Sequence, residues 1–444
     1  MSEANEFDCD LVLHGARVVA PAGDVDGGGI AVRDGRIVSV GPDAELAAWR
    51  SGANEVVDAS GQLLAPGLVN THCHAGDSLF RGLVENLSLE AWLEKVWIAE
   101  SAILDPHTTS LGAQLGLAEN LLAGVTSVFD MFWFPDTAAE AARQLGMRVA
   151  TGGLFFDGVG IDGKEQAVRL DEARAFCETW QDEPLVTPSL NPHATYTVGP
   201  QQLEGVARLA EETGALVTVH AAETRQEQST ARERFDATVL QHLEAVGLLG
   251  PQTVLAHCVH LEPGDLEIIR ATDSTVAHNP VSNLKLGSGI APVPEMLDAG
   301  VRVTLGTDGP ISGNDMDPWL GLRLAAILHK GRTMNPTTVS ARQAFDMATV
   351  RGAEAMRLDT GVLEAGRLAD FILLDLDGPH ATPLFDAVHH LVFAAGRADV
   401  RDVYVGGRRV VENRRLVHLD LDAVREEIGR LAPRIAATLE GAAG

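Results

Sequence analysis

Two histidines separated by one residue, in the segment His72-Cys73-His74, are the first residues in this chain whose spacing suggests chemistry. Residues two apart on a β-strand point to the same side of the sheet, so both imidazoles would face one centre. Two such rings suit a divalent metal, with bonds of about 2.0–2.1 Å each for zinc. Alone the pair is weak evidence, since two polar residues at the end of a strand would give the same pattern.

Two further residues strengthen the metal interpretation. His220 and Asp308 each follow another apolar, strand-like run. Together with His72 and His74 they supply three imidazoles and one carboxylate, and they leave space for a water molecule. The sequence therefore predicts a metal centre made by these four residues. Such a set of ligands accepts zinc, iron or manganese, which leaves the identity of the ion open at this point.

Two more residues could handle protons beside such a centre. A divalent metal lowers the pKa of its bound water from about 15.7 to about 7, and a proton carrier must then serve the leaving group. Glu223, three residues after His220, is the predicted carrier, and His257 is predicted to hold or polarise the attacking water. Asp308 could both bind metal and accept a proton. The alternatives are a solvated loop carboxylate for Glu223 and a structural histidine for His257.

One histidine has two equally weighted interpretations, and several other catalytic classes are excluded. His278 either lines the site or packs elsewhere. The chain has no HExxH motif, GxSxG elbow or P-loop, and it lacks the zinc signature of cytidine-type deaminases. A two-metal hydrolase of this design would need a bridging Lys or Glu near the end of the fourth strand. That strand ends in Asn191-Pro192-His193, so a single metal is predicted.

The elements that must position these residues are eight apolar runs that alternate with helical stretches. Eight β-α repeats over about 300 residues predict a (β/α)8 TIM barrel, in which all strand C-termini meet at one mouth. An open doubly wound sheet is the alternative, but no GxGxxG follows a strand. The eight runs are Leu63–His74, Thr126–Met131, Arg148–Phe156, Leu185–His193, Leu216–Glu223, Thr253–Val259, Thr275–Pro280 and Val301–Gly309.

Short strand-like runs at both ends of the chain predict a second, smaller domain. Turn residues divide residues 8–65 into five or six short strands, and similar runs return at Asp370–Leu376, Val400–Val405 and Arg408–Val411. We therefore expect a small β-sandwich domain built from both termini. Its first part is residues 1–65, the barrel is residues 66–364, and residues 365–444 form the second part with a closing helix after about Leu419.

Composition narrows the choice of partner and compartment. The 444 residues carry 34 basic and 62 acidic side chains, so the formal charge of 34 − 62 = −28 makes nucleic acid and anionic membranes poor partners. Four cysteines lack CxxC spacing, which excludes a disulfide framework or zinc ribbon. No signal peptide is visible, and no apolar run approaches the roughly 18 residues of a membrane span. A reduced, cytoplasmic protein is predicted.

Several of these motifs in combination resemble the amidohydrolase superfamily over nearly the whole chain. The similarity is greatest to the branch that holds the S-adenosylhomocysteine/methylthioadenosine deaminases and the s-triazine hydrolases. The segments that carry it are Pro66–His74, Ala256–Leu261, His278–Pro280 with Ser282–Leu286, Gly306–Gly309 and Gly361–Asp370. The resemblance implies one metal ion, zinc most often, on His72, His74, His220 and Asp308, with Glu223 and His257 as proton shuttle and water-orienting group.

The resemblance also implies residues that bind substrate. In the adenosine-type deaminases a Trp and a Glu after strand one, and a His ending strand four, contact the substrate. Trp92, Glu100 and His193 match those positions, although the stretch from Trp92 to Glu100 is one residue shorter than the usual pattern. Members that accept homocysteine also use arginines between strands three and four. This chain offers Arg169 and Arg174 there, but acidic residues directly precede strand four.

The function predicted from these observations is hydrolytic deamination of an amino-substituted N-heterocycle. Metal-bound hydroxide would attack the amino-bearing carbon of an adenosine-like substrate such as methylthioadenosine, adenosine or S-adenosylhomocysteine, and ammonia would leave. The alternatives are an s-triazine-type hydrolase that displaces chloride or an amine, a deaminase of guanine, pterin or cytosine type, a cyclic amide hydrolase, and a non-catalytic scaffold. The expected partners are a small heterocyclic substrate and further copies of the chain in a homo-oligomer, a dimer or tetramer.

Overall fold

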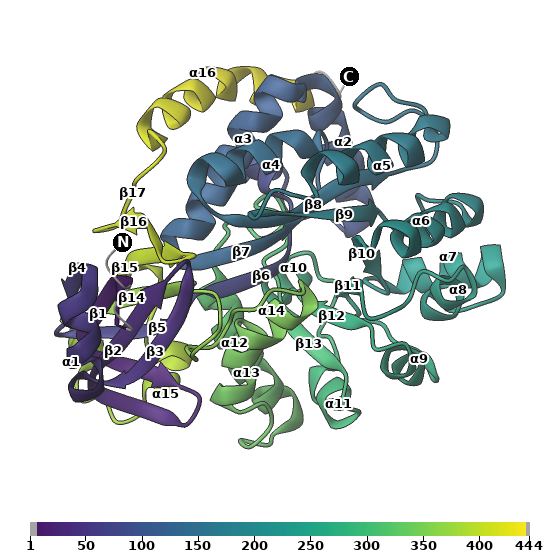
Figure 1. Cartoon of the computed structure of the whole chain (residues 1–444). Coiled ribbons are helices and arrows are strands. Elements are labelled where there is room, and N and C mark those ends of the chain that lie inside the picture. The colour runs from purple at the N-terminus through teal and green to yellow at the C-terminus, as the bar shows by residue number, and fades with distance from the viewer. Residues whose placement is uncertain (1–6, 441–444) are drawn as a thin grey trace.

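Eight parallel, mostly buried strands form a barrel at the centre of the computed structural model, which describes residues 7–440 (Figure 1). Each strand pairs in parallel with the next one along the chain, so the predicted (β/α)8 barrel is confirmed. The strands are β6 (Leu68–Cys73), β7 (Val125–Asp130), β8 (Arg148–Phe155), β9 (Val186–Pro192), β10 (Leu216–Ala221), β11 (Thr253–His257), β12 (Thr275–His278) and β13 (Arg302–Leu305).

Hydrogen bonds between the first and last strands bring the two edges of the barrel together. The backbone N–H groups of Thr307 and Asp308 donate to the carbonyl oxygen of His72, at 3.2 and 3.0 Å. Below them the Asn70 side chain exchanges two hydrogen bonds with Thr307, one to the hydroxyl and one from the backbone N–H. These contacts lie at the C-terminal ends of β6 and β13, so the same bonds that close the barrel bring Asp308 beside His72.

Helices surround the barrel and supply the walls of its mouth. Most lie between consecutive barrel strands, as a (β/α)8 fold requires (Figure 1). They are η1 (Ala75–Phe80), α2 (Leu89–Ile103), α3 (Pro106–Leu122), α4 (Pro135–Leu145), η2 (Gln166–Val168), α5 (Arg169–Trp180), α6 (Pro200–Thr213), α7 (Arg225–Phe235), α8 (Val239–Ala245), α9 (Asp265–Ala271), α10 (Pro280–Lys285), α11 (Val293–Asp298), α12 (Pro318–Thr333), α13 (Ala341–Met347) and α14 (Val350–Ala355).

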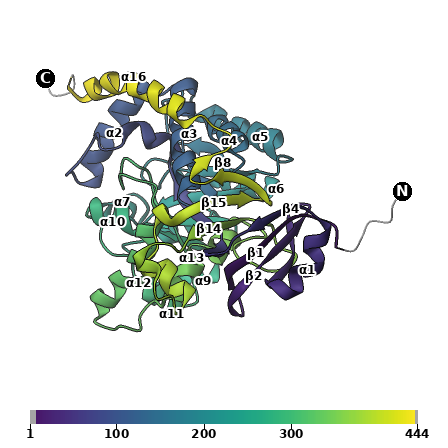
Figure 2. The ribbon, with the colours of Figure 1, turned by 90° about the vertical axis from the view of Figure 1, so that its left-hand side faces the viewer.

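Strands from both ends of the chain form a second sheet, which lies at one side of the barrel (Figures 1 and 2). This mixed sheet contains β1 (Cys9–Ala20), β2 (Gly23–Arg33), β3 (Arg36–Pro42), β4 (Ala53–Asp58), β5 (Gln62–Pro66), β14 (Phe371–Asp375), β15 (Val400–Val405), β16 (Arg408–Glu412) and β17 (Arg415–Leu416). Helices α1 (Asp43–Gly52) and α15 (Ala387–Phe393) and the short turns η3 (Pro379–Ala381) and η4 (Arg397–Asp399) lie between its strands. Residues 1–6 and 441–444 of the two predicted parts lie outside the described residues, and the exact domain boundaries stay a prediction.

One predicted element was wrong. The apolar run Leu63–His74 is not a single strand: β5 ends at Pro66 in the mixed sheet, and β6 begins at Leu68 in the barrel. Gly67 joins them at a point where a Cβ atom would lie 2.4 Å from the Thr126 side chain. The run stays apolar because both strands are buried, so hydrophobicity alone does not reveal the change of sheet.

The C-terminal helix α16 (Leu421–Glu440) packs beside α2 and α3 rather than on the mixed sheet (Figures 1 and 2). Its Val424 and Ile435 belong to a buried apolar cluster that also includes Trp92 and Val96 of α2. The guanidinium of Arg434 donates to the carbonyl oxygen of Ala102, at 3.1 Å. The closing helix predicted from the sequence therefore supports the helix that carries two of the expected substrate-binding residues.

Two further features concern the helices and the cysteines. None of the helices within residues 7–440 is long and apolar enough to cross a membrane. The four cysteines, Cys9, Cys73, Cys177 and Cys258, are buried and carry free thiols. The thiols do not take part in any covalent cross-link of the fold.

One buried ion pair joins the barrel to the mixed sheet. Arg148 at the start of β8 donates to both carboxylate oxygens of Asp370, at 2.7 and 3.1 Å. Asp370 is completely buried, and it also accepts a bond from the backbone N–H of Gly406. Its own carbonyl accepts from Gly67, the residue at the entrance to the barrel. Asp370 therefore links the barrel, the mixed sheet and the segment that joins them.

We expect Asp370→Ala to lower the free energy of unfolding by about 3–5 kcal/mol, because it leaves the Arg148 guanidinium buried without a counter-charge. The matched control is Asp359→Ala, which removes a half-exposed carboxylate 2.7 Å from Arg36 and should change stability by less than about 1 kcal/mol. Urea unfolding followed by circular dichroism measures both. Equal losses in the two variants would contradict the role given to Asp370.

Candidate active site

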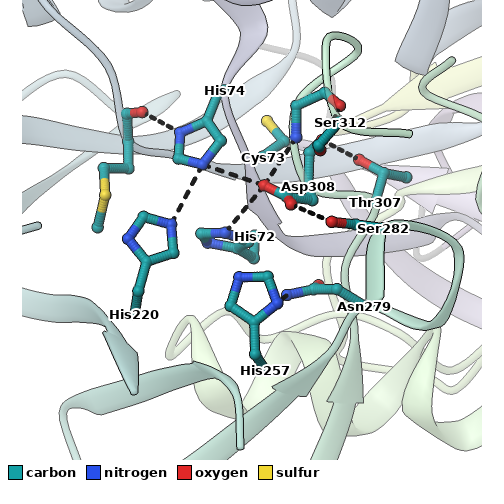
Figure 3. Close-up of polar contacts among 12 residues, drawn as sticks. His72, Cys73, His74, His220, His257, Asn279, Ser282, Thr307, Asp308 and Ser312 are labelled. Atoms are coloured by element: carbon teal, nitrogen blue, oxygen red, sulfur yellow. Dashed lines mark hydrogen bonds and ion pairs between the residues drawn. The ribbon is translucent and has the colours of Figure 1, made fainter. Parts of the chain in front are cut away.

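The chemistry-bearing residues identified in the sequence meet at the C-terminal mouth of the barrel (Figure 3). His74 directly follows β6, His220 lies near the end of β10, and Asp308 follows β13. The rings of His72, His74 and His220 and the Asp308 carboxylate are turned toward one another (Figure 3). Their ligand atoms all lie within 4.8 Å of one another. Three segments of sequence spread over more than half of the chain therefore form one cluster.

The spacing of these atoms suits one divalent metal ion. Asp308 Oδ1 lies 3.1 Å from His74 Nε2 and 3.4 Å from His72 Nε2, and the Nε2 atoms of His74 and His220 are 3.3 Å apart. Neighbouring ligands of one zinc ion, each at about 2.0–2.1 Å from it, would lie roughly 3–4 Å apart. In addition, both ring nitrogens of the fully buried His72 lack a hydrogen-bond partner among the described residues. An ion at the centre would give Nε2 of that ring a partner.

Neighbouring groups orient the ligands. The Nδ1 atoms of His74 and His220 pair with the backbone carbonyl oxygens of Met131 and His193, which leaves both Nε2 atoms facing the centre. The Ser282 hydroxyl donates to Asp308 Oδ2 at 2.6 Å, and the backbone N–H of Gly309 donates to Oδ1 at 2.8 Å. Such outer contacts are typical of metal sites, where they set both the tautomer of a histidine and the rotamer of a carboxylate.

Electrostatics favour the metal-binding protonation states of His72, His220 and Asp308. At His74, burial lowers the pKa, but the Asp308 carboxylate outweighs it and raises that pKa to about 9. Burial lowers the pKa of His72 to about 4, and burial together with the adjacent imidazoles lowers the pKa of His220 well below its usual value. Burial would raise the pKa of Asp308, but the adjacent imidazoles of His72 and His74 hold it well below its usual range. Neutral imidazoles and an ionised carboxylate are the ligand forms of these groups.

The backbone is strained where the strands end. Ala222, His257 and Asp308 have φ angles of +53°, +76° and +63°, in the left-handed region that residues other than glycine seldom adopt. Each such residue costs on the order of 1–3 kcal/mol unless its surroundings enforce the conformation. All three lie at the mouth, beside or within the cluster. Strain concentrated in this way is characteristic of functional sites.

Glu223 and His257 lie together beside the metal-ligand cluster. His257 Nε2 is 3.7 Å from Glu223 Oε2, and both side chains are buried. The other ring nitrogen of His257 donates to Asn283 Oδ1 at 2.8 Å, which leaves Nε2 free to accept a hydrogen bond. Burial raises the pKa of the Glu223 carboxyl. A buried carboxyl beside an imidazole can take up and return a proton near neutral pH.

The three residues expected to bind substrate line the same pocket as the cluster. Trp92 and Glu100 come from α2, and the indole N–H of Trp92 is buried without a partner among the described residues. Burial raises the pKa of Glu100 to about 7. His193 directly follows β9, and its Nδ1 pairs with the Thr197 hydroxyl at 2.8 Å. The shortened stretch between Trp92 and Glu100 therefore still brings both residues to the pocket.

The structure places several other residues differently from the simplest interpretation of the sequence. His278 is buried outside the pocket, with its ring centre 5.5 Å from that of His329 on α12, so packing is its observed role. Asp130, which ends β7, accepts a bond from the backbone N–H of Ala75 at 2.7 Å and supports the turn after the two ligand histidines. Both residues end barrel strands, yet neither lines the pocket.

Most of the residues that shape the pocket wall were not predicted from the sequence. Trp133 stacks on Phe156, with ring centres 5.2 Å apart, and Phe156 lies 4.5 Å from the His193 ring. Tyr196 and Trp97 meet the same histidine edge-on. Phe156 directly follows β8. A search for aromatic as well as polar residues at the ends of the predicted strands would therefore have found it.

Neither arginine considered for a substrate carboxylate lines the pocket. Arg169 is buried, and its guanidinium is paired with both oxygens of Asp162, at 2.9 and 3.1 Å. The same guanidinium lies over the Trp133 ring, 5.6 Å from its centre. Arg174 lies on the surface in an ion pair with Glu212. The side of the pocket formed by Trp133 and Phe156 is therefore aromatic, and the guanidinium over Trp133 is already paired with Asp162.

A barrel with four ligand side chains at its mouth and a buried carboxyl beside them defines a class of proteins that hold a divalent metal for hydrolytic chemistry. The chain belongs to the amidohydrolase family, whose model matches residues 63–410. The resemblance stated from the sequence is thereby confirmed.

Individual relatives and a solved structure agree with this assignment. The chain is 38% identical over 435 residues to a 5'-deoxyadenosine deaminase of Methanosarcina acetivorans, a match that covers 96% of this chain and 99% of that one. It is 39% identical to a 5-methylthioadenosine/S-adenosylhomocysteine deaminase of Syntrophobacter fumaroxidans, covering 92% and 94%. An adenosine deaminase from Xanthomonas campestris with bound zinc superposes with a TM-score of 0.93 at 31% identity, covering 97% and 99%.

We expect His72→Ala and Asp308→Ala to reduce bound metal to well below one ion per chain, because each variant removes a ligand from a set of four. Metal analysis of the purified proteins measures this. The matched control is His278→Asn, which changes a buried histidine on the neighbouring strand that faces away from the cluster and should leave the metal content unchanged. Full occupancy in both ligand variants would show that the ligands are other residues.

Proposed function

We propose that this protein is a metal-dependent aminohydrolase that deaminates an adenosine-like substrate. The observation that carries the proposal is the buried Glu223–His257 pair beside three histidines and an aspartate, in a pocket with aromatic walls. Attack of water on an aromatic amine needs an activated nucleophile and a proton carrier. Aromatic side chains can bind the flat ring of the substrate by stacking. The names of the relatives in both comparisons support the adenosine class.

In this proposal one metal ion is held by His72, His74, His220 and Asp308, and zinc is the expected ion because nitrogen donors prevail. When bound, the metal would supply a water molecule that is acidic enough to lose a proton at neutral pH. Three further predictions from the sequence are part of this proposal: one ion per chain, a homo-oligomer and a cytoplasmic location.

The proposed work of the protein's own residues is proton transfer. Glu223 accepts a proton from the attacking water and delivers it to the ring nitrogen next to the amino-bearing carbon. His257 Nε2 accepts a hydrogen bond from the same water and orients it toward the carbon. A C–O bond forms, the C–N bond breaks, and ammonia leaves with the second proton of the water. The ring ends as the corresponding oxo compound.

The pocket wall favours substrates whose 5′ group is neutral. A substrate carboxylate usually requires a bidentate arginine, since a buried unpaired charge costs several kcal/mol. The guanidinium of Arg169 lies over Trp133 of the aromatic wall, and it is already paired with the Asp162 carboxylate. The Trp133–Phe156 stack instead offers an apolar surface. We therefore infer that 5′-deoxyadenosine, methylthioadenosine and adenosine are better substrates than S-adenosylhomocysteine.

The substrate assignment can be tested by measuring ammonia release and kcat/KM for these four nucleosides at one pH. We expect the neutral compounds to exceed S-adenosylhomocysteine by at least about tenfold, because the amino-acid group finds no free arginine. A clear preference for S-adenosylhomocysteine would contradict the argument from the pocket wall. Activity on none of the four, together with turnover of a triazine, guanine or a pterin, would overturn the adenosine assignment itself.

Glu223→Gln keeps the shape of the side chain but cannot carry a proton, so we expect kcat to fall by at least about two orders of magnitude. The metal content should stay at the wild-type value, because Glu223 is not among the four ligands. Steady-state kinetics and metal analysis on the same preparation measure both effects. A rate close to that of the wild type would transfer the proton-carrying role to His257.

A further inference from the structure

A single segment that follows β12 contacts a metal ligand, the water-orienting residue and the proton carrier. Helix α10 (Pro280–Lys285) provides Ser282, which bonds to the ligand Asp308, and Asn283, which bonds to the imidazole of His257. These two contacts lie on successive residues of one short helix. The segment therefore supports the metal-ligand set and the water-orienting residue at the same time.

The same segment reaches the proton carrier through Ser288. The Ser288 hydroxyl lies 3.1 Å from Glu223 Oε1, and both side chains are buried. The other carboxylate oxygen, Oε2, faces His257 Nε2 at 3.7 Å. The two oxygens of Glu223 thus have different neighbours: one meets a hydroxyl from α10's continuation, and the other meets the imidazole.

His260 holds Ser288 in place. Its ring Nε2–H donates to the carbonyl oxygen of Ser288 at 2.7 Å, and its backbone N–H donates to the carbonyl of Ala222, the residue before Glu223, at 2.8 Å. The loop that carries His260 follows β11 and is thereby tied to both partners of the Ser288–Glu223 contact. This arrangement fixes the hydroxyl and the carboxylate relative to each other from both sides.

We propose that Ser288 is a positioning residue that keeps the transferred proton on Oε2 of Glu223, the oxygen nearest His257. By donating to Oε1 of the carboxylate, the hydroxyl occupies that oxygen and leaves Oε2 to take the proton from water. The same hydrogen bond prevents the carboxylate from rotating away from the reacting atoms. This inference rests on the proposed function only in that Glu223 is the proton carrier; it does not depend on which heterocycle is the substrate.

Ser288→Ala tests the proposal. We expect kcat to fall on the order of tenfold while KM and metal content stay unchanged, because a hydrogen bond to a charged group is lost without any change at the substrate or ligands. The acidic limb of the kcat–pH profile should move to higher pH by about one unit, since the carboxylate loses a donor that stabilises its charged form.

Two matched variants separate positioning from simple damage to the loop. Ser288→Thr keeps the hydroxyl and should recover most of the rate and the wild-type pH profile. Ser127→Ala removes a fully buried hydroxyl of β7 that has no partner among the described residues, and it should leave kcat and the pH profile unchanged. Equal losses in Ser288→Ala and Ser288→Thr, or a Ser288→Ala variant that changes KM alone, would overturn the proposal.

A second measurement needs no substrate. In protein loaded with zinc and labelled with ¹³C at the glutamate carboxyl, the Glu223 signal is the one missing from Glu223→Gln. Its titration should move to higher pH in Ser288→Ala and return in Ser288→Thr, and an unchanged titration would overturn the proposal. If the wild-type protein deaminates no aminopurine, the proposed function fails, and this titration still decides the role of Ser288.

Discussion

The rest of the site depends on the hydrogen bonds between the ends of the first and last barrel strands. The carbonyl of His72 accepts from the backbone of both Thr307 and Asp308, so closing the barrel and assembling the metal ligands are one event. The Asp308 carboxylate then lies between the rings of His72 and His74, which come from the other edge of the closure. A barrel that failed to close here would keep the ligand histidines of β6 without the Asp308 carboxylate beside them. Folding and ligand assembly are therefore coupled in this chain, as is usual for sites built from distant strands.

Two residues at the ends of barrel strands have a strained backbone conformation that the surrounding segments stabilise. Strands that simply ended would let their last side chains point into solvent, but His257 and Asp308 turn inward through left-handed backbone. Hydrogen bonds from α10 hold both of these residues after the turn, through Asn283 and Ser282. A short helix with no ligand of its own thus stabilises a conformation that the strand ends would not adopt alone. The site is preorganised because these supports lie on α10, between β12 and β13.

The metal ligands and the proton carrier could be predicted from the sequence because two simple rules apply to them. Side chains two apart share one face of a strand, which groups His72 with His74, and parallel strands bring their C-terminal ends to one mouth. The contacts that orient these groups obey no such rule. Ser288 meets Glu223 across 65 residues of sequence, through a loop whose course depends on its glycines and on His260. The change from one sheet to the other at Gly67 could not be predicted either, because both flanking strands are apolar and buried.

One part of the pocket wall, helix α2, is supported from outside the metal-ligand cluster, which has consequences for how substrate preference is determined. Trp92 and Glu100 belong to α2, and α2 packs on the C-terminal helix α16 rather than on the barrel strands alone. The Trp133–Phe156 stack forms another part of the wall and does not include any of the four ligands. Changes in these elements would alter which ring and which 5′ group fit while leaving the four ligands and Glu223 in place. A fold that separates the two tasks can keep one hydrolytic centre for several heterocycles, so the identity of the substrate must be sought in α2 and in the loops after β8 and β9.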